Sequence, residues 1–165
     1  MKSIISVILI GIIFFGVVFW QSNNFMPDSS FYNFKRIYEK IRIITINDPE
    51  QKADYYRSLL NIRHYELVYV VNKKKYDLVL STSLRYSTTA GTATEIIKTH
   101  KLAKQRKQLL GQFKNHKMKF ESLANIVSAH GNQKLYLIDA TNYIDYEQEK
   151  TGGFQKIILI CILNR

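Results

Sequence analysis

Histidine is the residue type in this chain best suited to acid–base chemistry or metal binding. It occurs four times, as His64, His100, His116 and His130. A zinc site on one helix uses spacings such as H-x-x-x-H, which place both rings on the same side. No two of these histidines have that spacing. His116 lies on the apolar face of a predicted helix; it could be a ligand or a pH switch, but we favour a partly buried ring. The histidines therefore predict no metal site.

Other signatures of catalysis are also missing from the sequence. The serines lie in no nucleophile-elbow pattern, and no glycine-rich phosphate loop occurs. Four acidic residues near the C-terminus could bind a cation, but we interpret them as a solvated helix face that offsets the lysines: Asp139, Asp145, Glu147 and Glu149. A single cysteine, Cys161, allows no disulfide within one chain. We therefore predict that the chain is not an enzyme and has no catalytic residue, metal or cofactor.

The strongest chemical signal is positive charge. The chain has 24 Lys and Arg against 13 Asp and Glu, for a formal net charge of +11. The stretch from Ile96 to Phe120 holds no acid and eight basic residues: Lys98, Lys101, Lys104, Arg106, Lys107, Lys114, Lys117 and Lys119. On one basic helix spanning 98–119 they would flank an apolar seam and could bind anionic lipid headgroups or a polyanion. The alternative is an ordinary solvated helix back.

An apolar segment near the N-terminus sets the environment of everything that follows. Ile4 to Trp20 carries no charge, and as a helix it would cover about 25 Å, the short end of a bilayer core. The C-terminal end of the segment, Val17 to Gln21, contains no Ala-x-Ala cleavage site, which favours a retained signal-anchor over a cleaved signal peptide. Lys2 precedes it, and no basic residue follows between Gln21 and Phe34. This charge pattern predicts a cytoplasmic N-terminus and a domain outside the cytoplasm.

The rest of the chain shows the three- and four-residue apolar spacing of amphipathic helices. The first predicted helix ends near Asn47 and has one aromatic-rich apolar face: Phe31, Phe34, Ile37, Tyr38, Ile41 and Ile44. The second starts at Asp48-Pro49, where Asp48 can cap the first turn and proline loses no hydrogen bond. Within it, Arg63 and Glu66 have the spacing of an ion pair.

Three more helices are predicted after a turn at Asn72–Lys75. Tyr76–Ile97 reads as a helix, although Asp77–Ser83 would also suit a strand because the following segment is rich in Ser and Thr. From Lys101 a regular seam runs through eight positions: Leu102, Arg106, Leu109, Phe113, His116, Phe120, Leu123 and Val127. Gly131 is a natural stop for that helix. The last helix covers Gln133–Lys150, although the apolar run Leu135–Ile138 within it would also suit a strand. Thr151-Gly152-Gly153 is expected to break the chain.

This order of motifs resembles a known family. It is carried by Pro27-Asp28-Ser29-Ser30-Phe31-Tyr32, Asp48-Pro49-Glu50, Leu59-Leu60 with Arg63 and Glu66, and Lys73-Lys75-Tyr76-Asp77. The chain is similar over roughly Met26 to Ile144 to the domain of unknown function 5667, a bacterial and archaeal family usually found after an N-terminal membrane segment. The resemblance implies an all-helical domain outside the cytoplasm. It implies no activity and no catalytic residues.

Together these patterns predict an all-α protein: a transmembrane signal-anchor at 1–24, an antiparallel bundle of about four to five helices at 25–150, and an apolar tail at 151–165. We expect a single-pass protein of the cell membrane that serves as a structural or protein-interaction module of the envelope. Binding of anionic polymers or lipid headgroups through 98–119 is the alternative. The expected partners are the membrane, through 4–20, and envelope proteins or anionic polymers, with self-association also open. Nucleic acid is not expected, because the domain faces outward.

Overall fold

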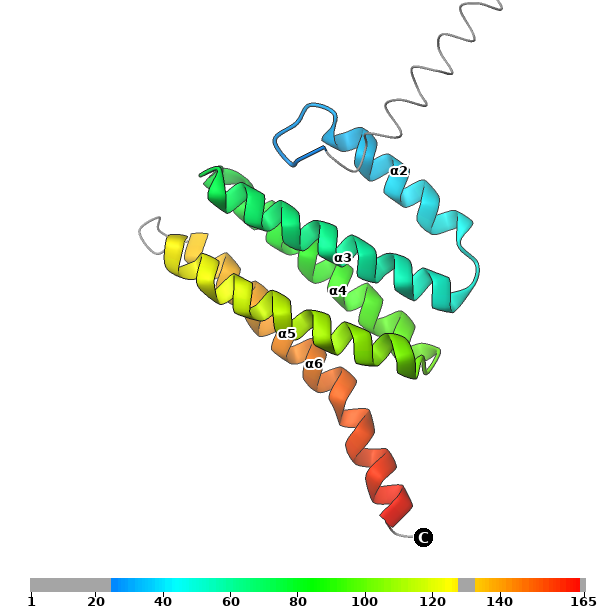
Figure 1. The fold of residues 1–165 in the computed structure, drawn as a ribbon. Helices are drawn as coiled ribbons and strands as arrows, with labels where there is room; N and C mark the ends of the chain where they lie inside the picture. The colour runs from blue at the N-terminus through cyan, green and yellow to red at the C-terminus, as the bar shows by residue number, and fades with distance from the viewer. Residues whose placement is uncertain (1–24, 128–132, 164–165) are drawn as a thin grey trace, which may run out of the picture. The chain divides into compact units, whose positions relative to one another are not determined.

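The computed structural model describes residues 25–127 and 133–163, and side chains up to Lys150. These residues form five α-helices and no strand (Figure 1): α2 (Tyr32–Thr45), α3 (Pro49–Asn72), α4 (Val79–Thr99), α5 (Ala103–Ile126) and α6 (Gln133–Leu163), with a short 3-10 helix, η2 (Tyr76–Leu78), before α4. The all-α prediction is confirmed. None of the helices in this described part is long and apolar enough to cross a membrane. The predicted signal-anchor at 1–24 and the predicted stop at Gly131 lie outside the described residues.

The chain divides into two compact units, with α2 in the first and α3 to α6 in the second. The first unit ends at Thr45 and the second begins at Ile46. In the second unit consecutive helices run antiparallel: α3 packs on α4, α5 packs on α6, and α4 packs on α6 (Figure 1). The four helices of the second unit are therefore two hairpins that share one core.

The core of this bundle is built by apolar side chains from all four helices. The largest include Leu60 and Leu67 of α3, Tyr86 of α4, Phe113 and Phe120 of α5, and Leu137 and Ile144 of α6. The seam predicted for α5 is buried from Leu109 to Val127, whereas Leu102 and Arg106 at its start are only partly buried. Burial of this shared apolar surface is the main force that holds the hairpins together.

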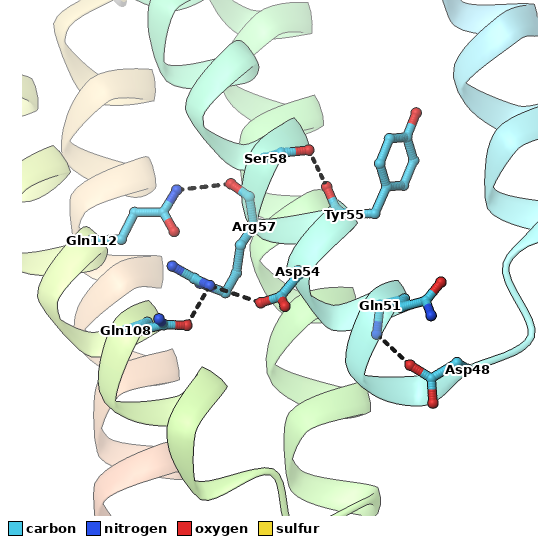
Figure 2. Close-up of polar contacts among 8 residues, drawn as sticks. All are labelled: Asp48, Gln51, Asp54, Tyr55, Arg57, Ser58, Gln108 and Gln112. Carbon is cyan, nitrogen blue, oxygen red and sulfur yellow. Dashed lines mark hydrogen bonds and ion pairs between the residues drawn. The ribbon is translucent and has the colours of Figure 1, made fainter.

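The start of α3 agrees with the sequence prediction (Figure 2). Asp48 is the N-cap, and its Oδ2 accepts a hydrogen bond of 2.8 Å from the Gln51 backbone N–H. Pro49 occupies the first turn, where its missing N–H costs nothing. The predicted ion pair further along is also confirmed. Arg63 Nη1 lies 2.9 Å from both carboxylate oxygens of Glu66, and both side chains are buried.

The helical interpretation of α4 is confirmed, and the strand alternative at Asp77–Ser83 is wrong. Its polar residues fit a helix because their hydroxyls bond within it: Thr88 and Thr89 each donate at 2.8 Å to the carbonyl four residues earlier. Gly91 leaves room for a side chain of α6. A Cβ at this position would collide with the Tyr143 hydroxyl, which occupies the space beside the glycine.

The basic stretch 98–119 is not one helix, which corrects the prediction. Lys98 lies in the last turn of α4, and Lys101 lies in the connection with a φ of 54°. The Lys101 and Leu102 N–H groups donate to the carbonyls of Lys98 and Ile97, so Lys101 takes the left-handed position of a Schellman motif. Lys74 takes the same position after α3, with a φ of 57°. Lysine thus ends both helices where glycine is usual, which hid the α4 end in the sequence.

The predicted break at Thr151-Gly152-Gly153 is also wrong, since α6 continues through it to Leu163. Glycine inside a helix costs only about 1 kcal/mol relative to alanine, and it ends a helix only when the backbone turns left-handed. Two adjacent glycines therefore weaken α6 at this point without stopping it.

Candidate functional site

A polar network inside the bundle joins three helices around His116 of α5. The Tyr86 hydroxyl of α4 lies 3.0 Å from His116 Nδ1, and Asn61 Oδ1 of α3 lies 3.1 Å from His116 Nε2. Gln112 of α5 donates through Nε2 to the Arg57 carbonyl at 2.9 Å and to Asn61 Oδ1 at 2.7 Å. His116 and Tyr86 are buried, whereas Asn61 is exposed, so the network runs from the surface into the core.

These contacts fix the tautomer of His116. Gln112 must present its amide nitrogen to the Arg57 carbonyl, because that oxygen can only accept. The same nitrogen faces Asn61, so the Asn61 atom is the acceptor oxygen. His116 Nε2 must therefore donate to Asn61, which leaves Nδ1 to accept from the Tyr86 hydroxyl. Every polar atom of the ring is satisfied in the neutral form.

His64 of α3 stacks directly on this ring. The ring centroids of His64 and His116 are 4.1 Å apart with an angle of 4° between planes, and the Phe120 ring lies beside the pair, 5.4 Å from His64 and 6.5 Å from His116. Burial first, and the neighbouring His64 second, lower the pKa of His116 to about 3. The pKa of His64 is also lowered, by burial and then by Lys119. Burial raises the pKa of Tyr86. All three groups are therefore held neutral near pH 7.

A second polar cluster lies nearer the start of α3 and bridges it to α5 (Figure 2). Arg57 Nη1 donates at 2.9 Å to Asp54 on its own helix and at 2.6 Å to Gln108 Oε1 on α5. Together with the Gln112 bond to the Arg57 carbonyl, it holds the two helices at a fixed register. The hydrogen bonds between α3 and α5 thus stabilise the packing of these two helices.

The contact between His64 and His116 was not predicted from the sequence. The two histidines lie on different helices, so no short spacing in the sequence pairs them as metal ligands. Only the packing of α3 beside α5 brings the rings together. Two rings do not make a metal site: in the described part of the chain, no group of three or more His, Cys, Asp or Glu side chains could hold a metal ion. His116 lies on the apolar seam as predicted, but it is more deeply buried than the partly buried ring that we expected, with an exposed fraction of 5%.

The acidic cluster near the C-terminus is not the uniform solvated face that we expected. Asp145 offsets a lysine as predicted, because Lys117 Nζ contacts its carboxylate at 2.6 and 2.8 Å. Glu147 is buried at 1% exposure, so its assignment to a solvated face is wrong. It faces inward because its position on α6 is three after Ile144, a core residue.

The eight basic residues of 98–119 fall into two groups. Four exposed lysines gather at the end of the bundle where α4 connects to α5: Lys98, Lys101, Lys104 and Lys107. The rest lie along α5, with Lys114 and Lys119 exposed and Arg106 and Lys117 partly buried. Because Lys117 pairs with Asp145, the charge available to an anion is concentrated at the α4–α5 end.

A surface cleft of about 310 Å³ lies between α5 and α6. Its lining is mixed: Glu121, Ala124, Asn125, Lys134, Ile138, Thr141 and Asn142. None of these residues was singled out from the sequence. One acid, one base and three uncharged polar groups on an open surface show no pattern that selects a ligand or a reaction.

Comparison with known proteins gives one match. The family model described as "Domain of unknown function (DUF5667)" matches residues 24–129, which includes α2 to α5. The match ends before the Ile144 boundary expected from the motifs. No curated protein and no solved structure matches the chain significantly.

Proposed function

We propose that this chain, which belongs to the DUF5667 family, is a non-catalytic structural or protein-interaction module of the cell envelope. The apolar segment Ile4–Trp20 anchors it in the membrane, with the N-terminus in the cytoplasm and the helical domain outside. The length and apolar character of that segment, and the absence of basic residues just after it in the sequence, support the anchor and its orientation.

One observation carries the structural role. The side chains of the kind that enzymes use, His116 and Tyr86 above all, are bonded to one another and to Asn61 across three helices. A hydrogen-bonded network of this type, in which both ring nitrogens of His116 have partners, rigidifies a bundle and favours one packing. It leaves the neutral His116 ring without a free nitrogen to accept or donate a proton to a substrate.

The anchor and orientation are tested with the full chain in a bacterium. A reporter enzyme that is active only outside the cytoplasm is fused after Arg165, so that α6 stays intact. We expect reporter activity and a chain that resists extraction at alkaline pH. The double variant Ile12→Arg/Ile13→Arg should lose both, since each arginine at mid-bilayer depth costs about 2.5–3.5 kcal/mol of insertion. Ser3→Arg, before the segment, is the matched control. An inactive reporter in the parent chain contradicts the proposal.

The interaction role is tested by cross-linking the full chain through its lysines in intact membranes. We expect a product that contains either a second copy or an envelope protein. A chain that stays uncross-linked, while a known membrane dimer in the same cells reacts, contradicts an interaction role.

Anion binding is a second candidate, favoured by the α4–α5 end of the bundle. Lys98, Lys101, Lys104 and Lys107 lie within ten residues and are all exposed, and the first turn of α5 holds no acid. The positive end of the α5 dipole adds to their mutual repulsion. A polyphosphate or an anionic wall polymer would relieve that repulsion.

Salt dependence separates this candidate from a plain solvated surface. The full chain in neutral-lipid nanodiscs should bind a polyphosphate at low salt and release it at high salt. Lys101→Glu/Lys104→Glu/Lys107→Glu should abolish binding. The control is Lys73→Glu/Lys74→Glu/Lys75→Glu, which reverses three exposed lysines at the opposite end of the bundle. Equal loss in both variants would mean that only net charge matters, and no binding at low salt ends the idea.

A further inference from the structure

The apolar face of α2 is open to solvent. Phe34, Ile37 and Ile41 are 56%, 55% and 51% exposed, and Ile44 at the C-terminal end is 77% exposed. Phe31, just before the helix, is 52% exposed and stacks near Phe34 with ring centroids 6.3 Å apart. Their three- and four-residue spacing places them on one side of the helix. This is a continuous row of large apolar side chains along all four turns of α2.

The opposite side of α2 is buried and polar. Tyr32, Lys35 and Glu39 are 4%, 1% and 5% exposed. Lys35 is held by a hydrogen bond of 3.1 Å from its Nζ to the Phe25 carbonyl, and its ammonium lies 5.7 Å from the Tyr32 ring. Both of these contacts lie within the first compact unit, on the side of α2 away from the apolar row.

Basic side chains border the apolar row. At 100° per residue, Lys40 falls on one edge of the row and Arg42 on the other, and both are exposed. Arg36 lies beyond Lys40 and is partly exposed. An apolar stripe with cations along its edges is the arrangement of helices that lie in a lipid headgroup layer, where the long stems reach outward to phosphates.

The sequence also keeps α2 near a bilayer. Eleven residues separate Trp20, at the end of the apolar segment, from Tyr32 at the start of α2. Even fully extended, that connection spans no more than about 40 Å. The closeness of α2 to a bilayer rests on the membrane anchor of the proposed function.

We propose that α2 lies flat on the outer surface of the membrane, with Phe34, Ile37 and Ile41 inserted among the acyl chains and Lys40 and Arg42 bound to anionic headgroups. The partner is a lipid surface with phosphatidylglycerol-like charge. A protein partner would need no pair of cations on both edges of the row, whereas a bilayer meets both edges with the same phosphates.

The test reads the depth of single positions in the full chain. With Cys161→Ser as background, an environment-sensitive fluorophore is attached at Ile37→Cys or, as control, at Tyr65→Cys. Tyr65 is an aromatic α3 side chain with a similar exposure of 59%. The chains are placed one per nanodisc, in phosphatidylcholine alone or mixed with phosphatidylglycerol. Some lipids carry a nitroxide quencher on the upper part of the acyl chain.

We expect a blue shift and strong quenching at position 37 in the anionic discs, and neither at position 65. Lys40→Glu/Arg42→Glu should reduce the quenching at position 37, and high salt should do the same in the parent. Water-like emission at position 37 overturns the proposal. So does a blue shift without lipid quenching that appears only in discs holding two copies, which would make α2 a dimer contact.

Failure of the anchor is distinguishable from failure of this proposal. A chain that does not enter nanodiscs contradicts the anchor. The same labelled chain is then mixed with preformed phosphatidylglycerol vesicles, and absence of quenching at position 37 still overturns the docking of α2.

Discussion

The helices α2 and α5 have the same apolar spacing in the sequence and opposite burial in the structure. In α5, Phe113 and Phe120 of the seam are fully buried. In α2, Phe34 and Ile37 of the equivalent face are more than half exposed, and the buried residues are polar. Periodicity therefore shows that a helix has an apolar face. It does not show whether that face meets the protein core or something else.

The largest expected effect is on the free energy of unfolding, and it tests whether the apolar face of α5 is buried while that of α2 is not. Phe120→Ala should lower the free energy of unfolding by about 3–5 kcal/mol, because it opens a cavity between α4 and α5. Ile37→Ala in α2 should change it by less than about 0.5 kcal/mol in detergent, since the side chain is exposed. Urea unfolding of the full chain in a mild detergent measures both. Similar losses in the two variants would show that the α2 face is part of the folded core.

The next effect is a pH dependence of the stability of the bundle, which tests the burial of His116 in its core. His116 is neutral in the folded state because burial lowers its pKa to about 3, whereas the unfolded chain takes up a proton near pH 6.5. The unfolded state binds more protons between these values, so stability present above pH 6.5 is lost as pH falls toward 3. From pH 7 to pH 5 we expect a loss of about 2 kcal/mol.

His116→Gln should reduce this pH dependence, with His64 keeping the remainder because its pKa is also lowered, and His100→Gln, at an exposed position, should leave it unchanged. Unfolding in urea at several pH values measures the slope. The helix α2 has no histidine, so the lipid contact proposed for it should respond less to this pH change. A parent chain with constant stability from pH 7 to pH 5 refutes the neutral buried ring.

A smaller effect tests how tightly the bundle helices approach. Gly91→Ala should cost about 1–2 kcal/mol, because the new methyl group meets the Tyr143 hydroxyl and the strain exceeds the gain in helix propensity. In a Tyr143→Phe background the hydroxyl is absent, and the same substitution should be neutral or slightly stabilising. Thermal unfolding of the four chains forms a double-mutant cycle. Additive effects would mean that the two residues do not meet.

The smallest effect concerns the bundle surface, where a charged pair joins α5 and α6, in contrast to the apolar exposed face of α2. The Lys117 and Asp145 side chains are 32% and 49% exposed. Asp145→Asn should therefore lower stability by less than about 1 kcal/mol, and salt should erase the difference. A large loss that persists in high salt would show that the pair is shielded from solvent.

Much of the local structure could be predicted from particular residues. Asp48 and Pro49 marked the start of α3, and the spacing of Arg63 and Glu66 predicted their ion pair. The seam of α5 was predicted from Leu102, and the prediction is confirmed from Leu109 onward. These features depend on neighbours within one or two helical turns, so they can be recognised without the fold.

Predictions failed where a local signal was ambiguous. Lys101 in a left-handed conformation ended α4 without a glycine, and Gly152 and Gly153 did not end α6. The cost of either arrangement is about 1 kcal/mol, which packing elsewhere in a helix easily outweighs. The boundary between the two compact units after Thr45 had no compositional signal.

The sequence alone determined the all-helical class, most helix starts, the excess of positive charge and the apolar character of residues 4–20, because each is set by composition or by short spacing. Tertiary structure decided which apolar face is buried, that His64 stacks on His116, and that the lysines of 98–119 divide between two helices. Each of these depends on how helices distant in sequence pack, and packing energy is shared by residues that no short pattern connects.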